Sequence, residues 1–443
     1  MAGPDAALEA PEAIDFGGSS ARPVVWAKHR NYVLAILFVA YFLNSIDRNI
    51  VNILQQAIKA EFQLDDFQLG LMTGFAFALF YASVGLPAAR LIDRGMKRTL
   101  IVSVGLALWS LMTGLSGIAQ NYWQLLFCRA GVGVGEGSFA PSGFTLISDY
   151  FSRNERARAT GIFLLGLPTA SLVGLASGGW IAQHYGWRSA LMIVGLPGLI
   201  VALIFKLTVR EPPRGLSDGK SVALTSAVPL REVLRKARSK KTFMHLLTAG
   251  SLASFCTVGG MVWFPAFLMR GFGLNAQQIG LWWGILSGVT GITGAILGGQ
   301  LSDRLGARDP KYVMLIPAVG MLVCLPFFLL ATTTADVRLA FAFLLVPATL
   351  NNFWLPPAIA LTQGIAPLAM RAIIGMLITF ALNLCGHGLA PPIIGKLSDV
   401  FGGFTGSQVD GLRWALVSIS IFYPLAALFF MRASRFVATD LED

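Results

Sequence analysis

The sequence is poor in charge. Of its 443 residues only 13% are charged and 55% are hydrophobic, whereas soluble domains carry roughly 25% charged residues. This composition excludes an ordinary soluble domain as the main body of the chain. The net charge of +11 does not indicate nucleic acid as a partner, because the basic residues lie in short loops between apolar runs, as orientation signals do.

Cysteine and histidine are also scarce. The four cysteines are scattered singly in apolar runs, which excludes a disulfide framework, and the four histidines lack the spacing of metal ligands. No nucleophile–base pair supports an enzyme, and we expect neither a cofactor nor a metal. Residues 1–30 lack the apolar core of a signal peptide, and their Gly, Ala, Pro and Ser content predicts a disordered cytosolic tail.

Long apolar runs, by contrast, are abundant. Twelve of them predict an all-α polytopic membrane protein with twelve transmembrane helices. The predicted parts after the tail are an N-terminal bundle (31–210), a linker (211–241), a C-terminal bundle (242–434) and a C-terminal tail (435–443). Apolar residues recur at helical spacing among basic ones late in the linker, which predicts a short amphipathic helix there; the alternative is a solvated basic linker.

The loops alternate in charge along the chain. Basic residues gather in the loops after the second, fourth, eighth and tenth runs and in the linker, whereas the alternate loops are poor in them. The positive-inside rule therefore predicts that the basic loops and both termini are cytosolic.

A short sequence pattern follows the second, fifth, eighth and eleventh apolar runs. Its four copies are Ala89-Arg-Leu-Ile-Asp93, Gly179-Trp-Ile-Ala-Gln183, Gly299-Gln-Leu-Ser-Asp303 and Gly395-Lys-Leu-Ser-Asp399. The copies alternate between inner and outer loops, so each half of the chain is predicted to be an inverted pair of three-helix units. Secondary transporters use this arrangement for alternating access around a midplane site.

The two inner copies predict a cytosolic gate. The fifth and eleventh helices begin in the cytosol and present their positive dipole ends there. We expect Asp93 to bind the start of the eleventh helix and Asp303 the start of the fifth, which would hold the inner side closed. The basic members of the predicted gate are Arg90, Arg94 and Arg304. The alternative is that these arginines only signal topology.

Two charges lie inside the fourth run, where charges are costly. Arg129 and Glu136 share one helix face, and the glycines between them leave room for a close neighbour. Asp47, in the first run, is expected at a similar depth. One arginine neutralises only one of these carboxylates fully, and burial favours the protonated form of the other. We therefore predict a proton-coupling site at Asp47, Arg129 and Glu136; the alternative is a fixed buried pair.

These features resemble the major facilitator superfamily. The Asp303-Arg304 copy fits that superfamily's loop motif well, although Ala89 replaces the opening glycine of the first copy. Three stretches resemble the Spinster-like transporters of bacterial type, namely 43–48, 129–138 and 367–391. The resemblance implies two pseudo-symmetric six-helix bundles with inverted three-helix repeats. It also implies movement of lysolipids, sphingolipid-type or other amphipathic molecules, with proton coupling in several members.

In this fold the first, fourth, seventh and tenth helices line a central cavity. From the N-terminal half we expect Asn44, Arg48 and Ser138 to line it; Arg48 either faces the cavity and holds an anionic headgroup or packs against another helix. The candidates from the C-terminal half are polar or aromatic: Thr257, Trp263, Asn351, Asn352, Trp354, Asn383 and His387. For the two tryptophans and the histidine, ordinary helix packing is the alternative.

The sequence thus predicts a secondary transporter, proton-coupled, for an amphipathic, lipid-like substrate. Two alternatives stay open: a carrier of small organic anions or sugar acids, which the Asn44 to Arg48 stretch also fits, and a transporter-like receptor. The expected partners are membrane lipids, the substrate and protons, but no nucleic acid. We expect a monomer in a bacterial inner membrane.

Overall fold

The structure is a computed structural model that describes residues 24–93, 95–213, 230–366 and 370–442. Its regular structure within these ranges is helical. The first half contains α1 (Val24–Phe62), α2 (Asp66–Gly70), η1 (Leu71–Phe75), α3 (Ala76–Asp93), α4 (Arg98–Ser116), α5 (Tyr122–Glu136), α6 (Phe139–Tyr150), α7 (Arg153–Leu164), α8 (Gly166–Thr169), η2 (Ala170–Gly174) and α9 (Leu175–Thr208).

The linker and the second half are helical too. They contain α10 (Leu230–Ser239), α11 (Lys241–Phe272), α12 (Ala276–Gly306), α13 (Tyr312–Thr333), α14 (Val337–Leu350), α15 (Leu355–Ile365), α16 (Arg371–Asn383), η4 (Leu384–Leu389), α17 (Ala390–Thr405), α18 (Gln408–Ile419), α19 (Phe422–Ser434) and α20 (Val437–Glu442). The elements η1, η2 and η4 are π-helical turns inside longer helices, a feature that often marks functional sites.

Ten continuous helical stretches are long and apolar enough to cross a membrane. One of them, Asn154–Thr208, contains two crossings, because the chain turns back at Gly186, where φ is 82° and favours glycine. A further crossing, 122–150, is divided into α5 and α6 at Gly137 and Ser138. The described chain therefore has the twelve crossings that the sequence predicts.

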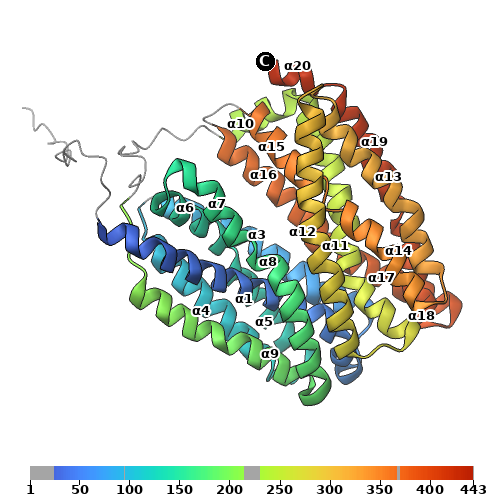
Figure 1. The fold of residues 1–443 in the computed structure, drawn as a ribbon. Helices are drawn as coiled ribbons and strands as arrows, with labels where there is room; N and C mark the ends of the chain where they lie inside the picture. The colour runs from blue at the N-terminus through green and yellow to red at the C-terminus, as the bar shows by residue number, and fades with distance from the viewer. Residues whose placement is uncertain (1–23, 94, 214–229, 367–369, 443) are drawn as a thin grey trace, which may run out of the picture.

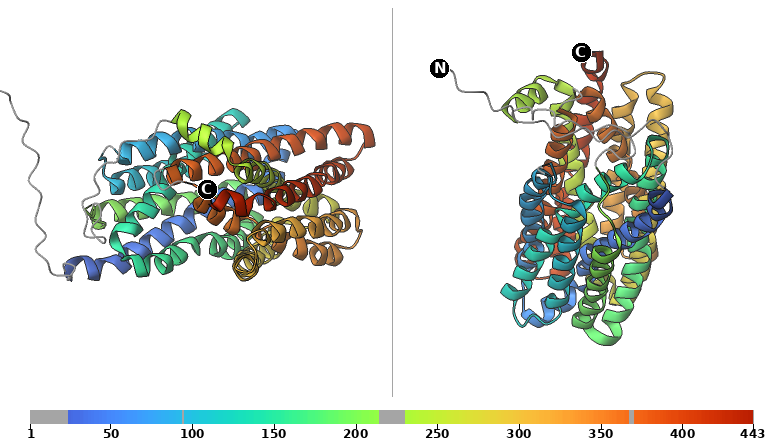
Figure 2. Two further views of the ribbon diagram at one scale, coloured as in Figure 1. Left: turned by 90° about the horizontal axis from the view of Figure 1, so that it is seen from above. Right: turned by 90° about the vertical axis from the view of Figure 1, so that its left-hand side faces the viewer.

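The crossings form two bundles that lie side by side (Figures 1 and 2). Helices α1 to α9 build the N-terminal bundle, and α11 to α19 build the C-terminal bundle. We call the end of the molecule with Asp303, α10 and α20 the motif face, and the end with Asp66, Gly186 and Asp399 the distal face. The bundles approach each other toward the distal face and diverge toward the motif face.

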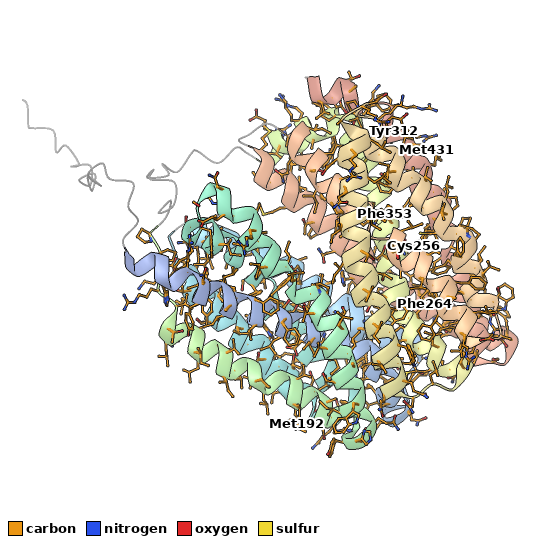
Figure 3. The ribbon with its side chains drawn as sticks, in the orientation of Figure 1. Met192, Cys256, Phe264, Tyr312, Phe353 and Met431 are labelled. Carbon is orange, nitrogen blue, oxygen red and sulfur yellow. The ribbon has the colours of Figure 1, made fainter. Side chains whose placement is uncertain are left out.

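Side chains fill the interior of each bundle (Figure 3). Cys256 and Phe264, for example, are buried in the C-terminal bundle. Large apolar side chains also cover the outside: Phe127 is 72% and Leu207 74% exposed. Such a surface suits a bilayer and would be a liability in water. The structure is thus an all-α membrane protein built from two six-helix bundles.

The segments outside the crossings differ in part from the prediction. Helix α1 begins at Val24, so the helical part of the chain starts before residue 31; the rest of the predicted disordered tail, 1–23, lies outside the described residues. The amphipathic helix α10 forms, and its apolar residues Val233 and Ala237 are buried against the C-terminal bundle. The tail is helical as α20, and a carboxylate oxygen of Asp440 accepts the Thr242 N–H at the start of α11 (2.7 Å).

Candidate transport site

The glycines of α5 fit it tightly between two neighbouring helices. A Cβ on Gly133 would lie 2.5 Å from the Phe77 carbonyl oxygen of α3, and one on Gly135 would lie 2.7 Å from the Gly105 carbonyl oxygen of α4. Both distances are too short for any side chain. The glycine-rich stretch therefore packs α5 closely against α3 and α4, as its small residues predict, and its charged face meets α1.

Glu136 forms an ion pair with Arg48 of α1. The Arg48 Nη2–H and Nε–H groups donate to Oε2 of Glu136 at 2.6 and 3.3 Å. The Glu136 side chain is fully buried, and its other oxygen, Oε1, has no hydrogen-bond partner among the described residues. Both hydrogen bonds that Arg48 makes to this carboxylate therefore fall on Oε2.

Asp47 and Arg129 lie together beside this pair. Nη1 of Arg129 approaches the backbone carbonyl oxygen of Asp47 at 3.5 Å, and both residues are buried. Within the described chain, Nε of Arg129 and Oδ1 of Asp47 have no hydrogen-bond partner. The four side chains of the cluster thus carry two negative and two positive formal charges, and the second guanidinium comes from Arg48.

This geometry changes the predicted network in one respect. We expected Asp47 and Glu136 to share the single guanidinium of Arg129, but Glu136 takes Arg48 as its partner. Arg48 lies about 100° around the helix from Asp47, but its long side chain still reaches α5. Arg48 therefore belongs to the charged cluster as well as to the predicted substrate site.

Arg48 is the most open member of the cluster. Its side chain is 25% exposed although it lies in the middle of the long helix α1. The guanidinium carbon lies 4.8 Å from the ring centre of Phe77 and 5.3 Å from that of Tyr81, both in α3. Cation–π contacts of this kind hold a guanidinium in place and leave its other N–H groups available. From the C-terminal bundle, His387 in η4 packs against η1: a Cβ on Gly74 would lie 2.4 Å from the His387 carbonyl oxygen.

The other predicted cavity residues make mostly local contacts. Asn44 and Ser138 are buried in the N-terminal bundle. In the C-terminal bundle, Nδ2 of Asn383 donates to the carbonyl oxygen one turn before it, and the same holds for Nδ2 of Asn352 and the Thr257 hydroxyl. Their contact with a substrate stays a prediction.

Three predicted cavity residues lie inside the C-terminal bundle. Trp263 is fully buried, and its indole N–H donates to the Pro391 carbonyl oxygen (3.0 Å). Trp354 is buried against Phe430. Asn351 donates to the hydroxyl of Tyr423 (3.1 Å). In this conformation Trp263 and Trp354 serve helix packing, the alternative that the sequence left open.

The contacts predicted for a cytosolic gate are not formed among the described side chains. Asp303 and Arg304 are exposed, and no side-chain hydrogen bond or ion pair joins either of them to another described residue. The side chains of Arg90 and Asp93 and the whole of Arg94 lie outside the described part of the structure. The gate contacts therefore stay predictions for a state in which the motif face is closed.

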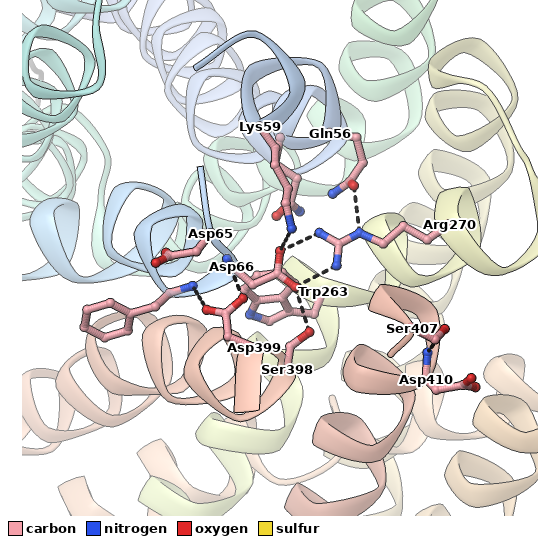
Figure 4. Close-up of polar contacts among 12 residues, drawn as sticks. Gln56, Lys59, Asp65, Asp66, Trp263, Arg270, Ser398, Asp399, Ser407 and Asp410 are labelled. Carbon is pink, nitrogen blue, oxygen red and sulfur yellow. Dashed lines mark hydrogen bonds and ion pairs between the residues drawn. The ribbon is translucent and has the colours of Figure 1, made fainter. Parts of the chain in front are cut away.

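Sequence reasoning missed an ionic cluster on the distal face (Figure 4). Asp66 at the start of α2 binds Arg270 of α11 and Lys59 of α1, and Asp399 of α17 lies beside it. These charges stand at the ends of apolar runs, where loop charges are common. The available signal was the fourth copy of the repeat, which ends in Asp399.

A second missed cluster lies on the motif face within the N-terminal bundle. Arg98 at the start of α4 pairs with Asp149 of α6, and its Nε–H donates to Glu211 (2.7 Å). The other Glu211 oxygen accepts the Thr99 N–H (2.8 Å) and so caps α4. Burial raises the pKa of Glu211, but the hydrogen bonds from Thr99 and Arg98 outweigh it and hold that pKa below its usual value.

Comparisons with known proteins agree with this architecture. The family model of the Major Facilitator Superfamily matches residues 37–386. An "MFS-type efflux pump" of Mycolicibacterium smegmatis is 28% identical over 443 residues, 100% of both chains. "Protein spinster homolog 1" of Bos taurus is 30% identical over 442 residues, which cover 93% of this chain and 82% of the relative.

Solved structures give the same result. A bacterial homologue of the human lysosomal transporter Spinster, in an inward-facing and unoccupied conformation, is 31% identical, with a TM-score of 0.84 over 93% of this chain and 98% of that one. The occupied inward-facing form of such a homologue has a TM-score of 0.82. The chain therefore belongs to the Major Facilitator Superfamily and, within it, to the Spinster-type secondary transporters, a family of transporters and not of enzymes.

Proposed function

We propose that this protein is a proton-coupled transporter in which Glu136 carries the proton and Arg48 senses it. The observation that carries the proposal is the buried Arg48–Glu136 ion pair, in which Oε1 of Glu136 lacks a partner among the described residues. A proton that binds this oxygen neutralises the carboxylate and weakens its attraction for the guanidinium. The protonation state of Glu136 then determines whether Arg48 is free to bind another anion.

Asp47 and Arg129 act on the same switch in this proposal. Both are buried, and neither completes an ion pair with the other's side chain. The burial of such incompletely paired charges is costly, so these residues would contribute little to stability in a purely structural role. We propose that Arg129 offers Glu136 or Asp47 a second counter-charge when Arg48 moves away.

Two observations support the conformational state and the membrane orientation that we propose. The solved Spinster homologue that this chain resembles is inward-facing, and in our structure the bundles diverge at the motif face. Basic loops and the basic helix α10 lie on that face, as the positive-inside rule requires of a cytosolic side. We propose an inward-facing monomer in a bacterial inner membrane, with both termini in the cytosol.

The substrate in this proposal is an amphipathic, lipid-like molecule with an anionic group. Arg48 offers the charge, and Phe77 and Tyr81 beside it offer apolar ring surface. The resemblance to Spinster-like transporters, noted in the sequence, led us to expect a substrate of this class. The second candidate is a small organic anion or sugar acid, since a partly exposed guanidinium also fits a lone carboxylate.

Transport in proteoliposomes tests the proposal. With an imposed pH gradient we expect movement of a fluorescent lysophospholipid and none of radiolabelled gluconate; the reverse would favour the second candidate. Glu136→Gln should abolish gradient-driven transport, because the amide cannot exchange a proton. Glu61→Gln is the matched control: Glu61 lies in the same bundle, but it pairs with Arg188 at the distal end of α1. Unchanged gradient-driven transport by the Glu136 variant would refute the proton role.

A further inference from the structure

We propose that the repeat copy after the eleventh crossing is a gate of the transport cycle on the distal face. We call Gly395, Ser398 and Asp399 of α17, together with Asp66 of α2 and Arg270 of α11, the distal latch. In the structure these residues hold the two bundles together. The inference rests on the proposed function only in that a transporter must open this face at some point.

Asp66 is the centre of the latch. Nη1 and Nη2 of Arg270 each donate to one of its carboxylate oxygens at 2.6 Å, in a bidentate pair. Nζ of Lys59 and the hydroxyl of Ser398 donate to the same carboxylate at 2.6 and 2.7 Å. Asp66 is only 2% exposed, so it binds three cationic or hydroxyl groups away from water. Arg270 and Ser398 belong to the other bundle, so this one carboxylate joins the two bundles (Figure 4).

Asp399 adds two hydrogen bonds in which the C-terminal bundle supplies the carboxylate and the N-terminal bundle the donors. Its two oxygens accept the backbone N–H groups of Asp66 and Phe67, each at 2.9 Å. These N–H groups belong to the first turn of a helix that continues through η1 and α3 to Asp93, and they have no intrahelical acceptor. The neighbouring Asp65 caps only its own helix, by accepting the Gln68 N–H (2.7 Å). A carboxylate of the C-terminal bundle thus completes a helix start of the N-terminal bundle.

Gly395 lets the two backbones meet. A Cβ on Gly395 would lie 2.2 Å from the backbone oxygen of Asp66, and one on Gly70 would lie 2.4 Å from that of Pro391. Backbone atoms cannot yield as a side chain can, so both positions require glycine in the closed state. The sequence Gly395-Lys-Leu-Ser-Asp399 is therefore explained residue by residue: the glycine allows the approach, Ser398 binds Asp66, and Asp399 caps its helix.

The other outer copy of the repeat lacks this device. There Gly179 packs against Gly280, and a Cβ on Gly179 would lie 2.4 Å from the Ala276 carbonyl oxygen. Gln183 stands in place of the aspartate, and the start of α12 is capped by its own Asn275, which accepts the Gln278 N–H (2.9 Å). Among the described residues, the carboxylate contacts that join the bundles at the distal face therefore connect α2 with α11 and α17. A fixed joint gains little from buried ion pairs, whereas a gate must release its contact.

Distances between spin labels across the distal face test the latch in the full chain in lipid nanodiscs. Gln63 at the end of α1 and Gly403 near the end of α17 are exposed and suit the labels. We expect Asp66→Asn and Asp399→Asn each to increase the long-distance population at least fivefold. Asp65→Asn is the matched control: it removes the adjacent, exposed carboxylate and should leave the distribution unchanged.

Arg270 provides the rescue. Arg270→Gln should open the distal face as Asp66→Asn does, and Arg270→Lys should restore part of the closed population because it keeps the charge. If Arg270 served packing alone, Arg270→Lys and Arg270→Gln should open the distal face equally. Closed distributions in the Asp66 and Asp399 variants would overturn the proposal. The outcome is separate from proton coupling, since the latch residues make no contact with Glu136: either test can fail alone.

Discussion

Two copies of one sequence pattern occupy opposite faces of this transporter in opposite states. Gly395-Lys-Leu-Ser-Asp399 on the distal face is engaged, with its glycine against backbone and its aspartate bonded to two N–H groups. Gly299-Gln-Leu-Ser-Asp303 on the motif face is free: a Cβ on Gly299 would meet nothing within 4 Å, and Asp303 is exposed.

The difference supports a gating role for the inverted repeat. Both copies lie near the end of a helix of the C-terminal bundle. The distal copy meets the start of α2 of the N-terminal bundle, and we predict that the motif-face copy meets the start of the fifth crossing when that face closes. The structure engages one and releases the other, as alternating access requires of gates on opposite sides. We infer that each copy supplies the local contacts of a gate, and that the relative position of the bundles determines which copy is engaged.

The glycines provide the largest predicted contrast. Gly395→Ala places a methyl group 2.2 Å from a backbone oxygen in the closed distal face. Overpacking of this kind costs about 3 kcal/mol, which is roughly a hundredfold change in the closed-to-open ratio. We expect the Gln63–Gly403 label pair to report a mainly open distal face.

Gly299→Ala is the counterpart of that variant. The added methyl group meets no neighbour in the present state, so we expect the distal distance to stay short. If the inner copy works as the outer one does, this variant should impair only the closure of the motif face. Equal opening of the distal face by both glycine variants would contradict the comparison.

Replacing Asp303 should have a smaller effect of the opposite sign. Asp303→Asn loses nothing in the present state but weakens the predicted closure of the motif face, where charge-assisted hydrogen bonds are worth about 1.5–3 kcal/mol. Labels at the exposed residues Ala157 and Ala307 should report a roughly tenfold increase in the open-to-closed ratio of that face. A shift toward the closed motif face would refute the gating role of the inner copy.

The smallest effect on the cycle is expected for contacts within one bundle. Glu211→Gln weakens the cap and the ion pair to Arg98 and should lower stability by about 1–3 kcal/mol without moving either label pair. The pKa of Glu211 is depressed in the folded state, so its stabilisation is present above the unfolded pKa and is lost as pH falls through the folded one. Thermal unfolding of the two proteins should therefore converge at acid pH; a constant difference would contradict this assignment.

The fold could be predicted from the sequence because its signals are local. Apolar runs of bilayer length give the twelve crossings, and the repeat gives the inverted units. The glycines between Arg129 and Glu136 were also informative, since small residues have one main use in helix packing. The spacing of Arg129 and Glu136, seven residues apart, allowed us to predict that they share one helix face.

Partners that are distant in the chain could not be predicted in the same way. Asp66 and Arg270 are 204 positions apart, and nothing in their local sequence distinguishes an inter-bundle ion pair from two loop charges. Arg48 was a known candidate, but its pairing with Glu136 depends on how α1 is rotated against α5. Trp263 lies inside the bundle for a similar reason: the helix rotation, which sequence spacing does not fix, turns it toward Pro391.

The central claim is that the two faces exclude each other's closed state. The most direct test measures both label pairs, Gln63–Gly403 and Ala157–Ala307, in the Asp399→Asn variant. We predict that the distal distance lengthens while the motif-face distance shortens in the same sample conditions. A distal face that opens with no change at the motif face, or a lengthening of both distances, would contradict the account.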